Sequence, residues 1–264
     1  MIVALIDSGF GLLPTAAWLR KLRPHVDLLL QLDPDGAPWG PKPGEWVIDR
    51  VVGTARAAVE LGADVIVIPC NTASVTALEH TRASIGPDIP VVGTVPAIKP
   101  AAAVCRSVAV WATAATTASP YQADLIAKFG GDATVTGVAC HGLAEAVDRG
   151  DMVAVRESIA AAAARTPDDV EGVVLGCTHY PLVVDHIVAA LPDGVRLFDS
   201  AQAVAAQTIR RMDALGRPST GNGTVRVYNS GRPGELPAGA AAYEPGRVLG
   251  ALLRRVGDEI SSQP

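Results

Sequence analysis

Charged and aromatic residues are scarce in this chain of 264 residues, at 19% and 4% of the sequence. The formal net charge is −5 and there is no basic run, which argues against nucleic acid or a membrane surface as the main partner. No apolar run reaches transmembrane length, and the first residues lack the cationic start of a signal peptide. The four cysteines show neither a Cys-x-x-Cys pair nor a zinc-ligand spacing, so we expect a cytoplasmic protein with reduced thiols and no metal.

Apolar residues, in contrast, make up 49% of the sequence, enough for a substantial core. Short β-branched runs alternate with helix-compatible stretches, which predicts an α/β fold with mostly parallel sheets flanked by helices. We expect strands at residues 2–6, 27–32, 65–68, 91–95, 107–111, 133–137, 173–175, 196–198 and 224–228. We expect helices at residues 44–61, 73–85, 122–129, 152–164, 183–191 and 201–215. These units form two similar lobes, a discontinuous first lobe of residues 1–94 and 206–264 and a second lobe of residues 95–205, with residues 216–223 as a loop.

Two of the four cysteines lie in similar surroundings, each after a short apolar run. Polar residues follow both of them: Asn71 and Thr72 follow Cys70, and Thr178 and His179 follow Cys177. A single free cysteine after a strand is usually a small buried hydrophobe. Polar neighbours at the carboxyl end of a parallel strand favour a ligand site instead, because ligands bind at that edge and buried polar groups need partners. Two such thiols predict an acid and a base on opposite faces of one small substrate.

Other polar residues follow predicted strands. Asp7, after the first strand, could bind an ammonium group, or it could belong to an ordinary turn that caps a helix. Thr113 and Thr116 either cap a helix or donate to a carboxylate. His179 is a candidate for activating Cys177, because an adjacent base or cation lowers the pKa of a thiol.

Four motifs occur in the order and approximate spacing of one enzyme family. They are Asp7-Ser8-Gly9-x-Gly11, Pro38-Trp39-Gly40, Cys70-Asn71-Thr72-Ala73 and Gly176-Cys177-Thr178-His179-Tyr180-Pro181. From residue 1 to about residue 231 the chain resembles glutamate racemase. The resemblance implies two α/β lobes with the active site in the cleft between them. It also implies cofactor-independent racemisation of glutamate by a pair of thiols, which supplies D-glutamate for peptidoglycan synthesis.

The resemblance also implies roles for individual residues. Cys70 and Cys177 would be the two acid/base residues, and Asp7 and His179 would each assist one thiol. The substrate would be bound by Asp7, Ser8, Trp39, Gly40, Asn71, Thr72, Thr113, Thr116, Thr178 and His179.

The sequence departs from the family pattern at four positions. Leu12 replaces the second glycine of a pair, and Gly36 stands where an arginine is common. Trp39 replaces a tyrosine, and Asp148 replaces a glutamate that is one methylene longer. These departures leave the pair of thiols intact but change the surroundings of the pocket.

Several alternatives stay open at this point. The chain could be another racemase or isomerase of the same superfamily, acting on aspartate or a hydantoin. It could also be a non-catalytic, two-lobed ligand-binding protein or a thiol-based redox sensor. The sequence leaves the oligomeric state open, a homodimer included.

Overall fold

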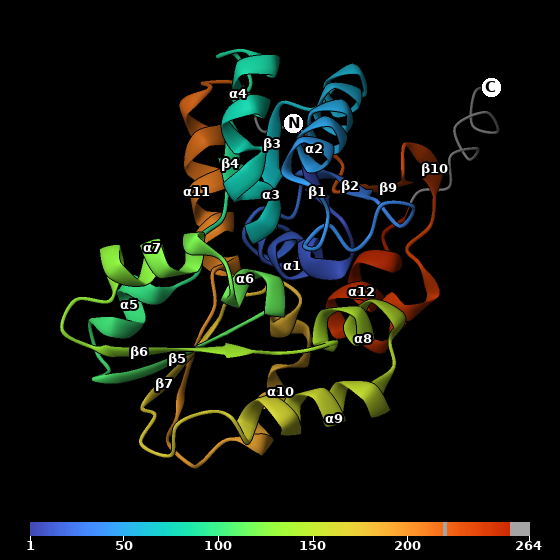
Figure 1. Cartoon of the computed structure of the whole chain (residues 1–264). Coiled ribbons are helices and arrows are strands. Elements are labelled where there is room, and N and C mark those ends of the chain that lie inside the picture. The colour runs from blue at the N-terminus through green and yellow to red at the C-terminus, as the bar shows by residue number, and fades with distance from the viewer. Residues whose placement is uncertain (219–220, 254–264) are drawn as a thin grey trace, which may run out of the picture.

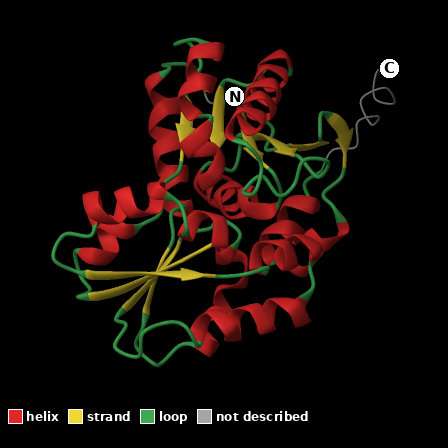
Figure 2. Ribbon diagram, viewed as in Figure 1, coloured by secondary structure: helices red, strands yellow, loops and turns green. Residues whose placement is uncertain are grey.

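The computed structural model describes residues 1–218 and 221–253, and it is built from two β-sheets with helices packed around them (Figures 1 and 2). The six-stranded sheet has the order β10-β9-β2-β1-β3-β4, and the four-stranded sheet has the order β6-β5-β7-β8. In Figure 1 the first sheet lies in the upper half of the molecule and the second sheet in the lower half, with α6 and α8 between them. Residues 219–220 of the predicted loop and residues 254–264 of the predicted first lobe lie outside the described residues.

The first sheet joins both ends of the chain. Its strands are β1 (Ile2–Asp7), β2 (Asp27–Leu32), β3 (Val65–Ile68), β4 (Val91–Gly93), β9 (Val225–Asn229) and β10 (Arg232–Gly234). All pairs are parallel except β9 with β10. The strand predicted at residues 91–95 ends at Gly93, because the backbone N–H of Thr94 donates to Ser74 Oγ at 2.9 Å instead of continuing the sheet. The short β10, which contains Pro233, was not predicted.

The second sheet is built from one continuous stretch of the chain. Its strands are β5 (Ser107–Ala112), β6 (Thr134–Ala139), β7 (Gly172–Leu175) and β8 (Arg196–Phe198), all paired in parallel. Every residue of β5 and β7 is buried, as in β3 of the first sheet. Strands buried on both faces are typical of parallel sheets covered by helices, which confirms the predicted α/β class.

The helices are α1 (Leu13–Leu22), α2 (Gly44–Glu60), α3 (Asn71–Thr76), α4 (Leu78–Ile85), α5 (Ile98–Ala102), α6 (Ala114–Thr117), α7 (Pro120–Phe129), α8 (Leu143–Arg149), α9 (Met152–Ala163), α10 (Val184–Ala190), α11 (Ala201–Ala214) and α12 (Glu244–Gly250). The single helix predicted at residues 73–85 is instead the pair α3 and α4, which meet at Ala77. Thr76 Oγ1 donates to the carbonyl of Thr72 at 2.9 Å, a side-chain bond of the kind that bends helices. Among the described residues, none of these helices is both long and apolar enough to cross a membrane.

Helix α11 lies where the sequence predicts the boundary between the lobes. The helix packs against α1, β3 and β4, although its first residues were assigned to the second lobe. The lobe boundaries stay a prediction; strands β1 to β4, β9 and β10 form one sheet, and strands β5 to β8 form the other.

Candidate active site

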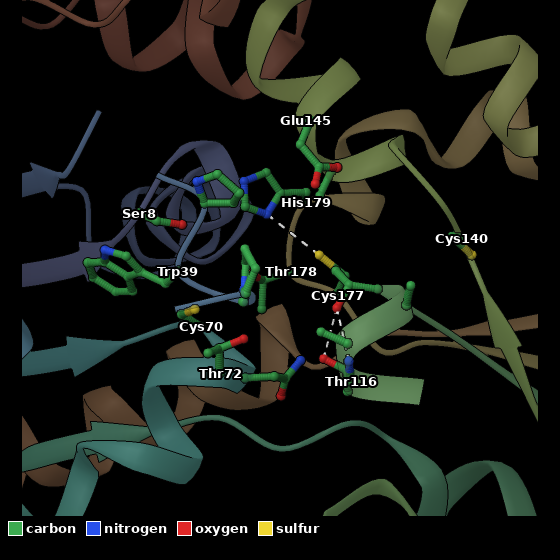
Figure 3. A pocket seen from close by; sticks show the side chains of 18 of the residues that line it. Ser8, Trp39, Cys70, Thr72, Thr116, Cys140, Glu145, Cys177, Thr178 and His179 are labelled. Carbon is green, nitrogen blue, oxygen red and sulfur yellow. Dashed lines mark hydrogen bonds between the residues drawn. The ribbon is translucent and has the colours of Figure 1, made fainter. Parts of the chain in front are cut away.

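A cavity of about 340 Å³ lies where the ends of β3 and β7, from the two sheets, meet (Figure 3). All the predicted site residues except Asp7 line it: Ser8, Trp39, Gly40, Cys70, Asn71, Thr72, Thr113, Thr116, Cys177, Thr178 and His179. The two sheets therefore bring together side chains that are more than a hundred residues apart in the sequence.

Cys70 lies between β3 and α3 and presents its thiol from the first sheet. Its backbone is extended, with φ −139° and ψ 121°, and the residue is buried. Burial raises the pKa of the Cys70 thiol well above its ordinary value, and the charge of Asp7 raises it further. The backbone N–H groups of Ala73 and Thr72 act in the opposite direction, because they favour the thiolate.

Asp7 ends β1 and is fully buried behind the cavity wall. Its carboxylate accepts hydrogen bonds from the Gly9 N–H at 3.1 Å, from Ser8 Oγ at 3.3 Å and from Thr178 Oγ1 at 3.4 Å. Burial raises the pKa of Asp7 to about 6, although the charge of His179 opposes the shift. The structure thus places Asp7 beside the cavity and not in its lining, where it acts on Cys70 through its charge.

Cys177 follows β7 and presents a half-buried thiol from the second sheet. His179 Nδ1 lies 3.6 Å from Cys177 Sγ, and His179 Nε2 lies 3.1 Å from Asp148 Oδ1 (the first of these is drawn in Figure 3). Burial alone would lower the pKa of His179, but Asp148 and Cys177 together hold it well above its usual value. The raised pKa favours the protonated imidazole, and its two ring nitrogens face the sulfur and the carboxylate.

Asp148, on α8, connects Cys177 and His179 to the loop that follows β1 in the first sheet. The Phe10 N–H donates to Asp148 Oδ1 at 2.7 Å. Burial alone would raise the pKa of Asp148, but the charge of His179 and this hydrogen bond hold the pKa below its usual value. The sequence analysis did not place Asp148 among the site residues. The only signal for it was its position as the acidic residue of the family pattern after Cys140.

Two glycines in the loop after β1 allow that loop to lie directly against Asp148 and Thr178. A Cβ atom at Gly9 would overlap the Asp148 carboxylate, and one at Gly11 would overlap Thr178 and Asp7. Only glycine therefore fits at these two positions of the loop after β1.

Asn71 also bridges the two sheets. Its Nδ2 donates to the carbonyl of Gly176 at 2.8 Å, next to Cys177. Its Oδ1 is buried and has no hydrogen-bond partner among the described residues. Asn71 lines the cavity, and its side-chain N–H is already engaged by the second sheet.

Thr113 fulfils one of its two predicted alternatives and contributes to the cavity as well. Its hydroxyl accepts from the Thr116 N–H at 3.3 Å and so caps α6, and the two hydroxyl oxygens are 2.9 Å apart. Both residues line the cavity. Cys140 lines it too, and burial raises the pKa of that thiol to about 12, whereas Cys105 packs in the core against the second sheet.

The ring of Trp39 lines the cavity, but its N–H does not point toward a ligand. Trp39 Nε1 donates to Asp33 Oδ2 at 2.9 Å, and the residue is only 1% exposed. The single donor of Trp39 is thus engaged by the protein itself. His141 and Glu145 also line the cavity, and no sequence motif indicated them. Among the described residues, no cluster of His, Cys, Asp or Glu could hold a metal ion.

Comparison with known proteins identifies the class of this enzyme. The family model described as Asp/Glu/Hydantoin racemase matches residues 20–208. The chain is 37% identical over 235 residues to a glutamate racemase of Pectobacterium carotovorum, which covers 86% of this chain and 81% of that protein. It is 38% identical over 259 residues to a glutamate racemase of Sphingopyxis alaskensis, covering 93% of this chain and 96% of that protein.

A solved structure shows the same similarity. The crystal structure of Escherichia coli glutamate racemase in complex with L-glutamate and the activator UDP-MurNAc-Ala has a TM-score of 0.82 and 28% identity, and it covers 96% of both chains. The chain therefore belongs to the Asp/Glu/Hydantoin racemase family. It is an isomerase, and within that family its relatives named here are glutamate racemases.

Proposed function

We propose that the enzyme interconverts L- and D-glutamate without a cofactor, using Cys70 and Cys177 as the two acid/base groups. The observation that carries the proposal is that two thiols from different sheets line one cavity. The similar Escherichia coli enzyme binds L-glutamate in its crystal structure, which supports glutamate as the substrate here.

The chemistry needs one thiolate and one thiol at a time. The thiolate takes the α-proton from one face of the substrate, and the electron pair of the broken C–H bond remains on the substrate as a carbanion. The thiol on the opposite face then gives its proton to that carbon. The two sulfurs have exchanged protonation states at the end, so the reverse reaction uses the same pair in opposite roles. The ordinary pKa of a thiol lies near the working pH, which suits proton transfer in both directions, and the N–H groups of Ala73 and Thr72 offset part of the rise that burial causes at Cys70.

Each thiol has its own assisting groups. The Asp7 carboxylate raises the pKa of Cys70 and so increases its strength as a base once the thiolate forms. His179 Nδ1 faces the sulfur of Cys177 and can exchange a proton with it, and Asp148 fixes the orientation of the imidazole. Asp7 and His179 are thus positioned to act in opposite directions of the reaction.

The carbanion needs donors near the α-carboxylate, where its negative charge accumulates. Thr72 and Thr178 line the cavity next to the two cysteines and can supply hydroxyl donors. The unpartnered Oδ1 of Asn71 supports a role in accepting a hydrogen bond from the substrate ammonium group. The side-chain carboxylate would then lie toward Ser8 and the 38–41 loop.

The proposal extends to the place and purpose of the reaction. The family resemblance supports a cytoplasmic enzyme whose D-glutamate is used in peptidoglycan synthesis. Aspartate is the main alternative substrate, and kcat/KM values that favour aspartate would replace glutamate in the proposal while leaving the pair of thiols in place.

Incubation with L- or D-glutamate in deuterated water tests the proposal directly. The protein, purified without added cofactor and treated with chelator, is expected to invert either enantiomer and to introduce deuterium at Cα. Cys70→Ser and Cys177→Ser are each expected to abolish inversion, because a serine hydroxyl is far too weak an acid to replace a thiol. Cys105→Ser, in the core, serves as the matched control. Inversion at the wild-type rate in either active-site variant would remove that cysteine from the mechanism.

A further inference from the structure

The loop of residues 38–41, which forms one wall of the cavity, is held from behind by a buried carboxylate. Asp33, just after β2, is 4% exposed. Its Oδ2 accepts from Trp39 Nε1 at 2.9 Å and from Arg50 Nε at 3.0 Å, and its Oδ1 accepts from Arg50 Nη2. Ser230 Oγ donates to Asp33 Oδ1 at 2.8 Å. We call Asp33, Trp39, Arg50 and Ser230 the Asp33 clamp.

The carboxylate of Asp33 has a hydrogen-bond partner on each of its two oxygens. Burial alone would raise the pKa of Asp33, but the hydrogen bonds from Arg50, Trp39 and Ser230 hold it below its usual value. The two-pronged contact of Arg50 with the carboxylate is the strong and directional form of an ion pair. A lysine cannot reproduce it, because an ammonium group lacks the planar fork.

The Asp33 clamp joins three segments that are distant in the sequence. Arg50 comes from α2, Ser230 comes from the turn between β9 and β10, and Asp33 and Trp39 come from the segment between β2 and α2. The same segment is also fastened by its backbone, since the N–H groups of Gly36 and Ala37 donate to the Asp33 carbonyl at 3.0 and 2.9 Å. The cavity wall is therefore fixed to two neighbouring elements at once.

Arg50 also explains the departure at Gly36, where an arginine is common in the family pattern. A side chain at Gly36 would overlap the Asp33 carboxylate and would bring its Cβ to 2.8 Å from Trp46 Cη2. In this chain the space is filled from the other side, because Arg50 reaches Asp33 across the ring of Trp46, 5.5 Å from its centroid. The arginine is thus supplied by α2 and not by the loop.

We propose that Arg50 and Asp33 are positioning residues for substrate binding, which act through Trp39 on the 38–41 wall. The inference rests on the proposed function, because it assigns the wall to the part of the substrate remote from the thiols. Contacts to that part are made equally in the ground state and the transition state, so their loss raises KM and leaves kcat nearly unchanged. If Arg50 and Asp33 had a merely structural role, their loss would lower thermal stability without raising KM selectively over kcat.

Arg50→Met and Trp39→Phe test the proposal. Each removes donors to Asp33 while keeping most of the apolar side chain. Because hydrogen bonds to a buried charged group are lost, KM for glutamate is expected to rise about 10- to 100-fold, with kcat changed by less than about threefold. Arg50→Lys is expected to give an intermediate KM. Arg56→Met is the matched control, since Arg56 lies on the same helix but is exposed and bonds to Ser84.

Hydrogen exchange provides a second measurement that does not depend on activity. The amides of residues 36–42 are expected to exchange at least about tenfold faster in Arg50→Met than in Arg56→Met, while those of β5 stay unchanged. Unchanged KM and unchanged exchange in folded Arg50→Met and Trp39→Phe would overturn the proposal, and so would a loss confined to kcat. If the wild type fails to racemise glutamate but exchange still accelerates, the proposed function is wrong and the clamp still holds the wall.

Discussion

Replacing the buried carboxylate of Asp7 by an amide is expected to stabilise the protein while it impairs catalysis. Asp7→Asn keeps the shape of the side chain, and its Oδ1 can still accept from the Gly9 N–H. The amide removes a charge that is unfavourable in a fully buried position. In the proposed mechanism the same charge assists Cys70, so kcat is expected to fall most in the direction in which Cys70 is the base. The ratio of kcat/KM values for the two enantiomers cannot change, because the equilibrium constant of a racemisation is one.

The size of the stabilisation follows from the pKa of Asp7, which is raised from 3.8 to about 6 in the folded protein. A shift of roughly two units corresponds to about 3 kcal/mol. Since the folded-state pKa lies above the unfolded value, the stabilising contribution of Asp7 is complete below about pH 4 and is lost as the pH rises through about 6. At pH 8 the wild type therefore lacks up to about 3 kcal/mol that Asp7→Asn retains, which corresponds to about 6–12 °C in Tm for a chain of this size.

The assay is thermal unfolding of both proteins from pH 4 to pH 8. The difference in Tm is expected to be small at pH 4, to open between pH 4 and pH 7, and then to remain constant. Asp185→Asn, at an exposed position of α10, controls for the change in net charge. A Tm of Asp7→Asn equal to or below that of the wild type at pH 8, or a difference independent of pH, would refute the reasoning.

Two further substitutions test the contacts across the cavity. Asp148→Asn is expected to lower the pKa of His179, because the Asp148 carboxylate is the main group that raises it. NMR titration of the imidazole measures this fall, and an unchanged titration of His179 would contradict the expectation. Turnover is expected to drop most in the direction in which Cys177 is the base. Asn71→Ala removes the bond to the carbonyl of Gly176 and the unpartnered acceptor, so kcat/KM is expected to fall about 10-fold or more in steady-state assays, whereas an effect under about twofold would exclude Asn71 from substrate binding.

The sequence predicted the sheets well because buried parallel strands leave a strong local pattern. The strands predicted at residues 27–32, 65–68 and 196–198 match β2, β3 and β8 at both ends. Helix ends were harder: the break at Ala77 leaves no glycine or proline signal in the sequence. The short edge strand β10 carries little pattern of its own.

The pair of thiols was predictable because each stands at the end of its own strand and precedes polar residues. The direction in which a donor points was not predictable. The side-chain N–H of Trp39 donates to Asp33, and the side-chain amide of Asn71 donates to the carbonyl of Gly176. The contacts of Asp148 and Arg50 depend on how α8 and α2 pack, which no spacing in the sequence specifies.

The order in which the chain is synthesised has a consequence for the site. Strands β5 to β8 are contiguous, so the second sheet can pair as soon as residue 198 has left the ribosome. In the first sheet β2 must wait for β9, and Asp33 is separated from Ser230 by 197 residues. Because contacts this far apart close late, we expect the wall behind Trp39 to be among the last parts of the nascent enzyme to take its final form.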